Sequence, residues 1–441
     1  MDANELLLEA QDLNQQASML IKAGNLDAAK VKLDKAIEIE PMLVDSYRNY
    51  GDLCMAASMY KEAKNYYKKA LLVEKVPVVY FLYGNACFMN DELHEGLEYY
   101  NLAISAGFDS DEMMFFMGMA YEHLNDDRMA LRYFQRACAK NPSRPDYLIK
   151  KIAVLVRLDM LDSAEEEIDN LLQIAPEMYD GYHMKTQFLI HSGKVDEALK
   201  FSKEAIDRFP ADSELMFDYV KCVSLTKNFA LALSLIESAK KMKYFGESKR
   251  AFLILEAQVL AESGDYEKAS SCCDECIATE DDEFYAGEAR FLLMNFALVQ
   301  QNLEKALTQA ESLVAHDAED SYYFAALYYK AFCLMKLGKN DEARKAYKEA
   351  ISIYRLTTLK KPGAIDVYLY RAMCLKDLEE FDKALEMLDF VLGLNTEVAE
   401  VYALKADIYV ALGKNTQADE QREKAYLLKP DLRPDTAKVG E

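Results

Sequence analysis

Three closely spaced cysteines, Cys272, Cys273 and Cys276, are the residues of this chain whose type and spacing most favour chemistry. Thiols at such spacing can hold a metal ion or form a redox-active pair. The sequence has no second cysteine pair with histidines at the spacing of zinc ligands, and its nine cysteines follow no regular framework. We therefore interpret the three as small packing residues, and keep a metal- or redox-active protein as the remote alternative.

The histidines and paired acids form no catalytic or metal-binding pattern either. His183 and His191 fall on one predicted helix, about 12 Å apart along its axis, which is too far for them to share an ion. The acidic pairs at 126–127 and 281–282 fall in predicted turns or linkers, where acids cap helices. The sequence contains no glycine-rich phosphate loop, no nucleophile elbow and no His-Glu-x-x-His motif. We predict a protein without enzymatic activity, without a cofactor and without a bound metal.

The composition is that of an ordered, acidic protein. Hydrophobic residues make up 51% of the 441 residues, and there are only 16 Gly and 9 Pro. Acidic residues outnumber basic ones by 75 to 52, which gives a net charge of −23. A field of this sign repels nucleic acid and anionic membranes and favours a basic protein or peptide. The alternative is that the acidity only keeps a long surface in solution.

The sequence also predicts a cytoplasmic protein. Its first eleven residues carry acids where a secretory signal has positive charge and an apolar core. No later run approaches the roughly 18 uninterrupted apolar residues of a membrane-spanning helix. The odd number of cysteines agrees with a reducing compartment.

The elements that position all these residues are copies of one repeat. The clearest copy occupies residues 111–142. Its marker residues are Gly118, Tyr121, Ala130, Phe134 and Pro142. If Gly118 is position 8, small residues recur at positions 8, 20 and 27 and aromatics at 4, 11, 17 and 24, with a period of 33 or 34 residues in the first seven copies. The small residues let two helices of one hairpin approach closely.

On these residues the chain resembles the tetratricopeptide repeat family, with about twelve repeats over residues 10–430. The resemblance implies an all-α fold, an α-solenoid in which antiparallel helix pairs stack into a right-handed superhelix with a concave groove. The chain departs from the family in having no Trp, and in the wider spacing of its later repeats.

The spacing predicts four segments. Residues 1–245 form a regular array, residues 246–363 a looser one, residues 364–430 a final pair with a polar capping helix over 416–428, and residues 431–441 a flexible tail. In the looser segment the position-20 alanines are 37 residues apart from Ala232 to Ala343, and then 41 to Ala384. The extra residues lengthen either a helix or a loop, and the Lys-Lys-Pro-Gly sequence at 360–363 ends an extended helix.

The start of the chain bears on its oligomeric state. Leu6, Leu7 and Leu8 form an apolar triplet with no earlier repeat to pack on. We expect these residues to extend the first helix over the first repeat of a monomer, with a dimer contact as the alternative.

The candidate binding residues follow from the family resemblance, which implies that positions 2, 5, 9, 12 and 13 of each first helix line the groove. Several of them are large apolar residues that the repeat itself does not require, and such clusters mark binding surfaces when they are exposed. The alternative is that they pack on one another. The predicted groove residues are Phe81, Asn85, Phe88, Met89, Glu112, Phe115, Met119, Glu122, Asp146, Asp180, His183, Tyr328, Phe332 and Met335, with Phe291 and Leu298 beside the last three.

Position 2 is acidic in eight repeats, which predicts either simple helix-dipole stabilisation or an acidic rail along the groove. The eight residues are Asp45, Glu112, Asp146, Asp180, Glu214, Glu288, Asp366 and Glu400. The family's carboxylate clamp for chaperone tails is not expected, because Asn14 and Asn49 are followed by Val78 and Leu82 where basic residues are needed.

The sequence therefore predicts a scaffold that binds a protein or peptide in its groove. The alternative is a sensor or regulator that binds a peptide and changes its superhelical pitch.

Overall fold

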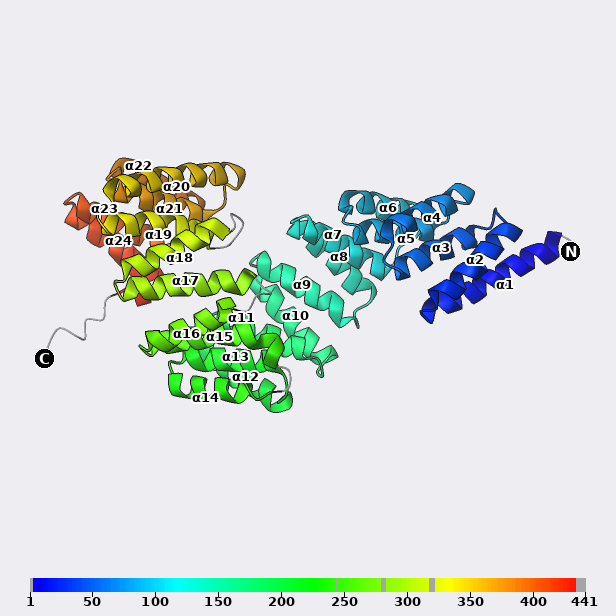
Figure 1. Ribbon diagram of the computed structural model, residues 1–441, viewed down its shortest axis with the longest axis horizontal. Helices are drawn as coiled ribbons and strands as arrows, with labels where there is room; N and C mark the ends of the chain where they lie inside the picture. The colour runs from blue at the N-terminus through cyan, green and yellow to red at the C-terminus, as the bar shows by residue number, and fades with distance from the viewer. Residues whose placement is uncertain (1–2, 243–244, 279–282, 317–321, 434–441) are drawn as a thin grey trace. The chain divides into compact units, whose positions relative to one another are not determined.

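The computed structural model describes residues 3–242, 245–278, 283–316 and 322–433. Within these ranges the regular structure consists of 24 α-helices and one short 3-10 helix, without a strand (Figure 1). The all-helical repeat fold predicted from the sequence is thus confirmed. The acidic pair at 281–282 and residues 434–441 of the tail predicted at 431–441 lie outside the described residues.

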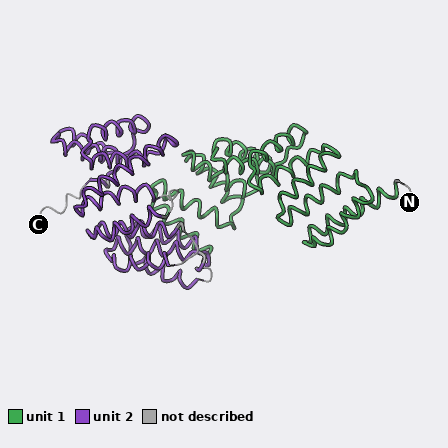
Figure 2. The backbone as a smooth tube through the Cα atoms, turned by 45° about the horizontal axis from the view of Figure 1, so that its top comes forward, with its two compact units in different colours: residues 1–209 green, residues 210–441 purple. Residues whose placement is uncertain are grey.

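The chain divides into two units, residues 1–209 and 210–441, with six helical hairpins in each (Figure 2). The helices of the first unit are α1 (Ala3–Lys22), α2 (Leu26–Ile39), α3 (Val44–Ala56), α4 (Tyr60–Val73), α5 (Pro77–Met89), α6 (Leu93–Ser105), α7 (Asp111–His123), α8 (Asp127–Lys140), α9 (Pro145–Arg157), α10 (Leu161–Ile174), α11 (Tyr179–His191) and α12 (Val195–Arg208). Each odd-numbered helix is the first of a repeat and pairs with the even-numbered helix that follows it.

The second unit continues the same pairing. Its helices are α13 (Ser213–Leu225), α14 (Phe229–Ala239), α15 (Phe245–Glu262), α16 (Tyr266–Ala278), α17 (Glu283–Val299), α18 (Leu303–His316), α19 (Tyr323–Lys336), α20 (Asn340–Lys360), α21 (Ile365–Asp377), α22 (Phe381–Leu394), α23 (Ala399–Ala411) and α24 (Asn415–Leu428). In both units a second helix also packs on the first helix of the next repeat, as α4 does on α5 and α20 does on α21.

Small residues bring the two helices of a hairpin together, as the repeat pattern predicts. A Cβ atom added to Gly96 would lie 3.2 Å from the carbonyl oxygen of Gly84, which is position 8 of the same repeat. The position-20 alanines are all inaccessible to solvent: Ala29, Ala63, Ala130, Ala164, Ala198, Ala232, Ala269, Ala306, Ala343, Ala384 and Ala418. Any larger side chain at these positions would force the paired helices apart.

A residue with positive φ joins the two helices of every hairpin. These residues are Gly24, Ser58, Asp91, Asn125, Asp159, Gly193, Lys227, Gly264, Gln301, Gly338, Glu379 and Gly413. Their spacing is 33 or 34 residues up to Lys227, then 37, then 41, and 34 for the last step. The turns thus repeat the spacing read from the alanines.

Lys227 is a position where this turn conformation is costly, because φ is 61° and a side chain clashes with the backbone there. We expect Lys227→Gly to raise the free energy of unfolding by about 0.5–1 kcal/mol. Urea denaturation followed by circular dichroism measures the change. Lys227→Ala is the matched control, since it removes the same exposed side chain but keeps the strain. Equal stabilisation by both variants would contradict this explanation.

The wider spacing of the later repeats is caused by longer helices rather than by longer loops alone. The first helices α15 and α17 have 18 and 17 residues, against 13 for α13. The second helix α20 has 21 residues, and it ends at Lys360, immediately before Lys361 and Pro362. The expectation of an extended helix ended by the Lys-Lys-Pro-Gly sequence is confirmed.

The ends of the array are also helical. The apolar triplet at 6–8 belongs to α1, as expected, although Leu8 remains 65% exposed. The last helix, α24, buries only Ala418 and Ala425; most of its other residues are polar, although Leu427 is 81% exposed. Among the described helices, none combines the length and the apolar character that crossing a membrane requires.

Candidate functional site

The predicted groove residues of the third and fourth repeats lie on α5 and α7, two first helices that contact one another. The sequence left open whether these residues are exposed or packed, and the structure separates them into two groups. Phe81 belongs to the core, with 6% of its surface exposed and its ring stacked on that of Phe108 at 5.2 Å. Asn85 accepts a hydrogen bond of 2.7 Å from the Tyr100 hydroxyl. Phe81 is therefore part of the core, and Asn85 joins the two helices of its own repeat, α5 and α6.

The other large residues of these two helices form a partly exposed apolar surface. The ring of Phe88 meets that of His123 edge-on at 5.6 Å, and Phe115 stacks on Tyr147 of the next repeat at 4.7 Å. Met119 is partly buried, and Met89 is 46% exposed. We use the name α5–α7 face for the following set: Phe88, Met89, Glu112, Phe115, Met119 and His123.

The acidic residues predicted beside this face differ in how far their charge is already neutralised. Glu122 on α7 binds Lys150 at 3.0 Å and Arg157 at 2.9 Å, both from α9. Asp146 forms two hydrogen bonds with Arg144, and these lower the pKa of its carboxyl. Glu112, by contrast, is exposed and has no ion-pair partner among the described residues.

The acidic residues at position 2 differ in whether their charge is already paired within the protein. Asp45 pairs with Arg48 at 2.9 Å, and Glu400 pairs with Lys429 at 2.9 Å, which lowers the pKa of Glu400. Burial raises the pKa of Glu288. Three of the eight acids, Asp45, Asp146 and Glu400, are thus paired within the protein. Glu112 and Asp180 are the predicted site acids that have no ion-pair partner among the described residues.

Asn14 and Asn49 of the first two repeats and His183 of the sixth are all engaged in contacts within the protein. Asn14 and Asn49 are buried and bond to each other, the Asn49 amide donating to the Asn14 side-chain oxygen at 3.2 Å. They are therefore not open to a peptide carboxylate. His183 is partly buried on α11 and has partners of its own.

The second predicted cluster, in the tenth repeat, is largely structural. Tyr328 is 3% exposed, and its hydroxyl donates to Asp377 at 3.0 Å. Phe332 and Met335 are partly buried against the core, as are Phe291 and Leu298. The ring of Phe332 lies 5.9 Å from that of Tyr328, so these residues pack on one another.

The three clustered cysteines lie in the second unit's core. Cys273 and Cys276 pack with residues such as Leu253, and Cys272 lies at the edge of the same cluster. Burial raises the pKa of Cys272 to about 11 and that of Cys273 to about 12. A thiol with so high a pKa is a poor nucleophile at neutral pH, and the three residues act here as packing groups.

One group of side chains in the first unit has the composition of a metal site. Cys87, Glu92 and Glu95 bring their ligand atoms within 4.8 Å of one another. The ammonium group of Lys64 already binds both carboxylates, at 2.7 Å from Glu95. Burial raises the pKa of Cys87 to about 12. Lys64 supplies the positive charge that a cation would bring, so this group is an internal ion pair.

Two contributions to this region were missed in the sequence. Phe116, at position 6, links Phe81 and Phe88 with ring distances of 6.5 and 5.7 Å. Lys150 and Arg157 neutralise Glu122 from one repeat away. The apolar residue at position 6 could have indicated that Phe116 packs in this region. The ion pairs of Glu122 could not be foreseen, because they depend on how α7 and α9 are placed.

Comparison with known proteins agrees with the repeat fold. Family models described as tetratricopeptide repeat match residues 322–392 and 399–432. A glutamate–tRNA ligase from Clostridium botulinum is 29% identical over 178 residues, which cover 37% of this chain and 34% of the ligase. Anaphase-promoting complex subunit 3 from Schizosaccharomyces pombe is 24% identical over 176 residues, covering 38% and 25%. The chain thus spans about a third or less of these relatives.

Among solved structures, the chain is similar to YrrB, described as a TPR protein with an unusual peptide-binding site. The two are 22% identical over 42% of this chain and 95% of YrrB, with a TM-score of 0.37. A likeness at this level carries no argument about function. The matched repeats and the hairpins and turns that continue them along the described residues agree on one conclusion: the chain is a tetratricopeptide repeat protein.

Proposed function

We propose that the protein is a non-enzymatic scaffold that binds a protein or peptide through the α5–α7 face. One observation supports this above all. Phe88, Met89 and Met119 stay partly exposed on neighbouring first helices, although the small residues and aromatics of each hairpin already fill its interior. Partly exposed apolar side chains that gather on one surface are typical of protein interaction sites.

The charges around the face describe the partner. Glu112 offers a free carboxylate at the start of α7, while the carboxylate of Glu122 at its other end is neutralised by Lys150 and Arg157. We infer a partner segment with apolar anchors for Phe88 and Met89 and a basic residue for Glu112. The net charge of −23 would also speed the approach of a basic partner.

The setting we propose is an assembly in the cytoplasm. The relative from Schizosaccharomyces pombe is by its name a subunit of a complex, which fits a protein-binding role. None of the nine cysteines, all of which lie in the described part of the chain, is in a disulfide, as expected in a reducing compartment. The aligned part of the glutamate–tRNA ligase covers 34% of that enzyme, and we propose no ligase activity.

An experiment that introduces charge into the apolar residues tests the proposed face. We expect the double variant Met89→Glu and Met119→Glu to recover its partners at least about tenfold less well than the wild type, because two anchors become charged. The measurement is affinity purification of the full chain from its native cells, with quantitative mass spectrometry. Circular dichroism checks that the variant is folded.

The matched control carries the same substitutions on second helices. Leu72 and Leu102 are 80% and 47% exposed on α4 and α6. Leu72→Glu and Leu102→Glu should leave the recovery of partners unchanged. A folded Met89/Met119 variant that recovers the same partners as this control would place the binding site elsewhere.

A further inference from the structure

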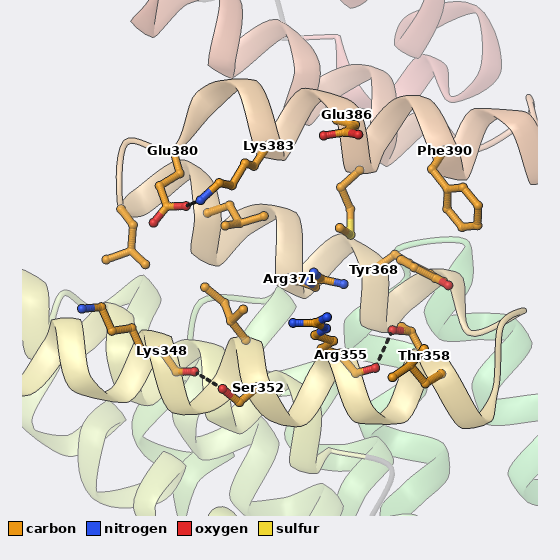
Figure 3. Close-up of a pocket in the computed structure, with 15 residues that line it drawn as sticks. Lys348, Ser352, Arg355, Thr358, Tyr368, Arg371, Glu380, Lys383, Glu386 and Phe390 are labelled. Atoms are coloured by element: carbon orange, nitrogen blue, oxygen red, sulfur yellow. Dashed lines mark hydrogen bonds and ion pairs between the residues drawn. The ribbon is translucent and has the colours of Figure 1, made fainter.

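A cavity of about 790 Å³ opens between the second helices of two consecutive repeats in the second unit. Its walls are α20 and α22, and α21 forms its floor (Figure 3). The α5–α7 face is formed by first helices, so this cavity belongs to a different kind of surface. A volume of this size lies in the range of ligand-binding cavities.

The extension of α20 builds one wall of the cavity. This helix has 21 residues, whereas second helices such as α4 have 14. The seven extra residues add about 10 Å of helix. They include Arg355, Thr358 and Leu359, which all line the cavity. The lengthening of α20 thus contributes directly to this cavity.

Two arginines face one another at the centre of the cavity. Arg355 projects from α20 and Arg371 from α21, and Figure 3 shows their guanidinium groups side by side. Within the described part of the chain, the Nε atom of Arg371 is buried without a hydrogen-bond partner. Burial, and then the positive charge of Arg355, lower the pKa of Arg371. Two like charges held together in this way are stabilised by an anion between them.

The acids near the arginines do not neutralise them. Glu380 is paired with Lys383 at 2.6 Å, and Glu386 lies on the opposite wall. In the described residues neither arginine forms an ion pair with an acid. The charged side chains that line the cavity are Lys348, Arg355, Arg371, Lys383, Glu380 and Glu386. Basic groups thus prevail here, although acids prevail in the chain as a whole.

The outer end of the cavity is apolar. Phe390 on α22 is 50% exposed, and its ring lies 5.2 Å from that of Tyr368 on α21. Met387 and Ile351 also line the cavity. An isolated inorganic ion would leave this part empty. The combination suits a peptide that carries an anionic group beside an apolar side chain.

We propose that this cavity binds a peptide segment whose oxyanion lies between Arg355 and Arg371 and whose neighbouring apolar side chain packs on Phe390. A carboxylate and a phosphate share the geometry that two guanidinium groups recognise, each accepting paired N–H donors. A phosphoryl group carries more charge and more acceptor oxygens, so it would bind more tightly than a carboxylate.

Calorimetric titration of the full chain tests the proposal. The probe is an acetylated peptide, Gly-Gly-Leu-phosphoserine-Leu-Gly-Gly, compared with the same peptide carrying Asp or Ala at the central position and with inorganic phosphate alone. We expect affinity to fall in the order phosphoserine, Asp, Ala. Inorganic phosphate should bind at least about tenfold more weakly than the phosphopeptide, because it lacks the apolar contact.

Three variants assign the binding to the cavity. Arg371→Met and Arg355→Gln should each weaken binding of the phosphopeptide at least about tenfold. Arg344→Gln is the matched control, since Arg344 is exposed on the same helix but does not line the cavity. Arg355 is itself exposed, so its replacement leaves the fold intact. No binding of the phosphopeptide by the wild type, equal binding of inorganic phosphate, or undiminished binding by the folded Arg355→Gln variant would each overturn the proposal.

Discussion

Phe134→Ala is expected to lower the free energy of unfolding by about 3–5 kcal/mol, the range found when a fully buried aromatic ring is truncated. The ring of Phe134 on α8 is inaccessible to solvent and lies 5.7 Å from that of Phe115 on α7. It fills the space that the small residue at position 8 leaves in the hairpin. Urea denaturation monitored by circular dichroism measures the loss.

The fit between this ring and Gly118 supplies the control. A Cβ atom on Gly118 would lie 2.6 Å from the Phe134 ring, so Gly118→Ala alone should cost about 1–3 kcal/mol. In the Phe134→Ala background the clash is gone, and the same change should be neutral or stabilising, because Ala favours a helix more than Gly does. If Gly118→Ala costs the same in both backgrounds, the ring is not what requires glycine there.

Asp377→Ala is expected to destabilise the second unit by roughly 2–6 kcal/mol, since two buried hydroxyl groups lose their acceptor at about 1–3 kcal/mol each. Asp377 Oδ2 on α21 accepts from Tyr328 on α19 at 3.0 Å and from Tyr347 on α20 at 2.7 Å. This carboxylate therefore joins two consecutive repeats. The midpoint of urea denaturation should fall accordingly.

A variant that lacks the Tyr328 and Tyr347 hydroxyls shows how much of the cost of Asp377→Ala comes from their hydrogen bonds. In the variant Tyr328→Phe and Tyr347→Phe, the further change Asp377→Ala should cost no more than about 1 kcal/mol, because the hydroxyls that the carboxylate serves are absent. A cost that stays above this value would mean that Asp377 stabilises the repeats through some other contact.

The fold could be predicted from the sequence because the residues that specify it act within one hairpin. The alanine at position 20 and the small residue at position 8 meet inside a single repeat, and their spacing alone sets the register. The end of the long helix α20 could also be predicted, since a proline such as Pro362 cannot continue a helix that precedes it. Such local rules do not depend on how neighbouring repeats are placed.

The state of the binding residues could not be predicted in the same way, because their environment comes from other repeats. Phe81 is covered by Phe108 of the following helix–loop segment, and Glu122 is neutralised by residues 28 and 35 positions later. Whether Arg355 and Arg371 lie opposite one another depends likewise on the register between α20 and α21. Periodicity gives the face of a helix on which a side chain lies, but not what the next helix brings against it.

The length of α20 indicates which insertions a repeat of this kind can accept without losing its packing. Each residue turns a helix by about 100°, so seven added residues complete nearly two turns and restore the original phase. Tyr347 and Tyr354, seven residues apart, are accordingly both fully buried on one side of α20. An insertion of five residues would rotate the added segment by about 140° and expose that side. Steps of two turns thus allow one repeat to acquire a new cavity while its neighbours keep their packing.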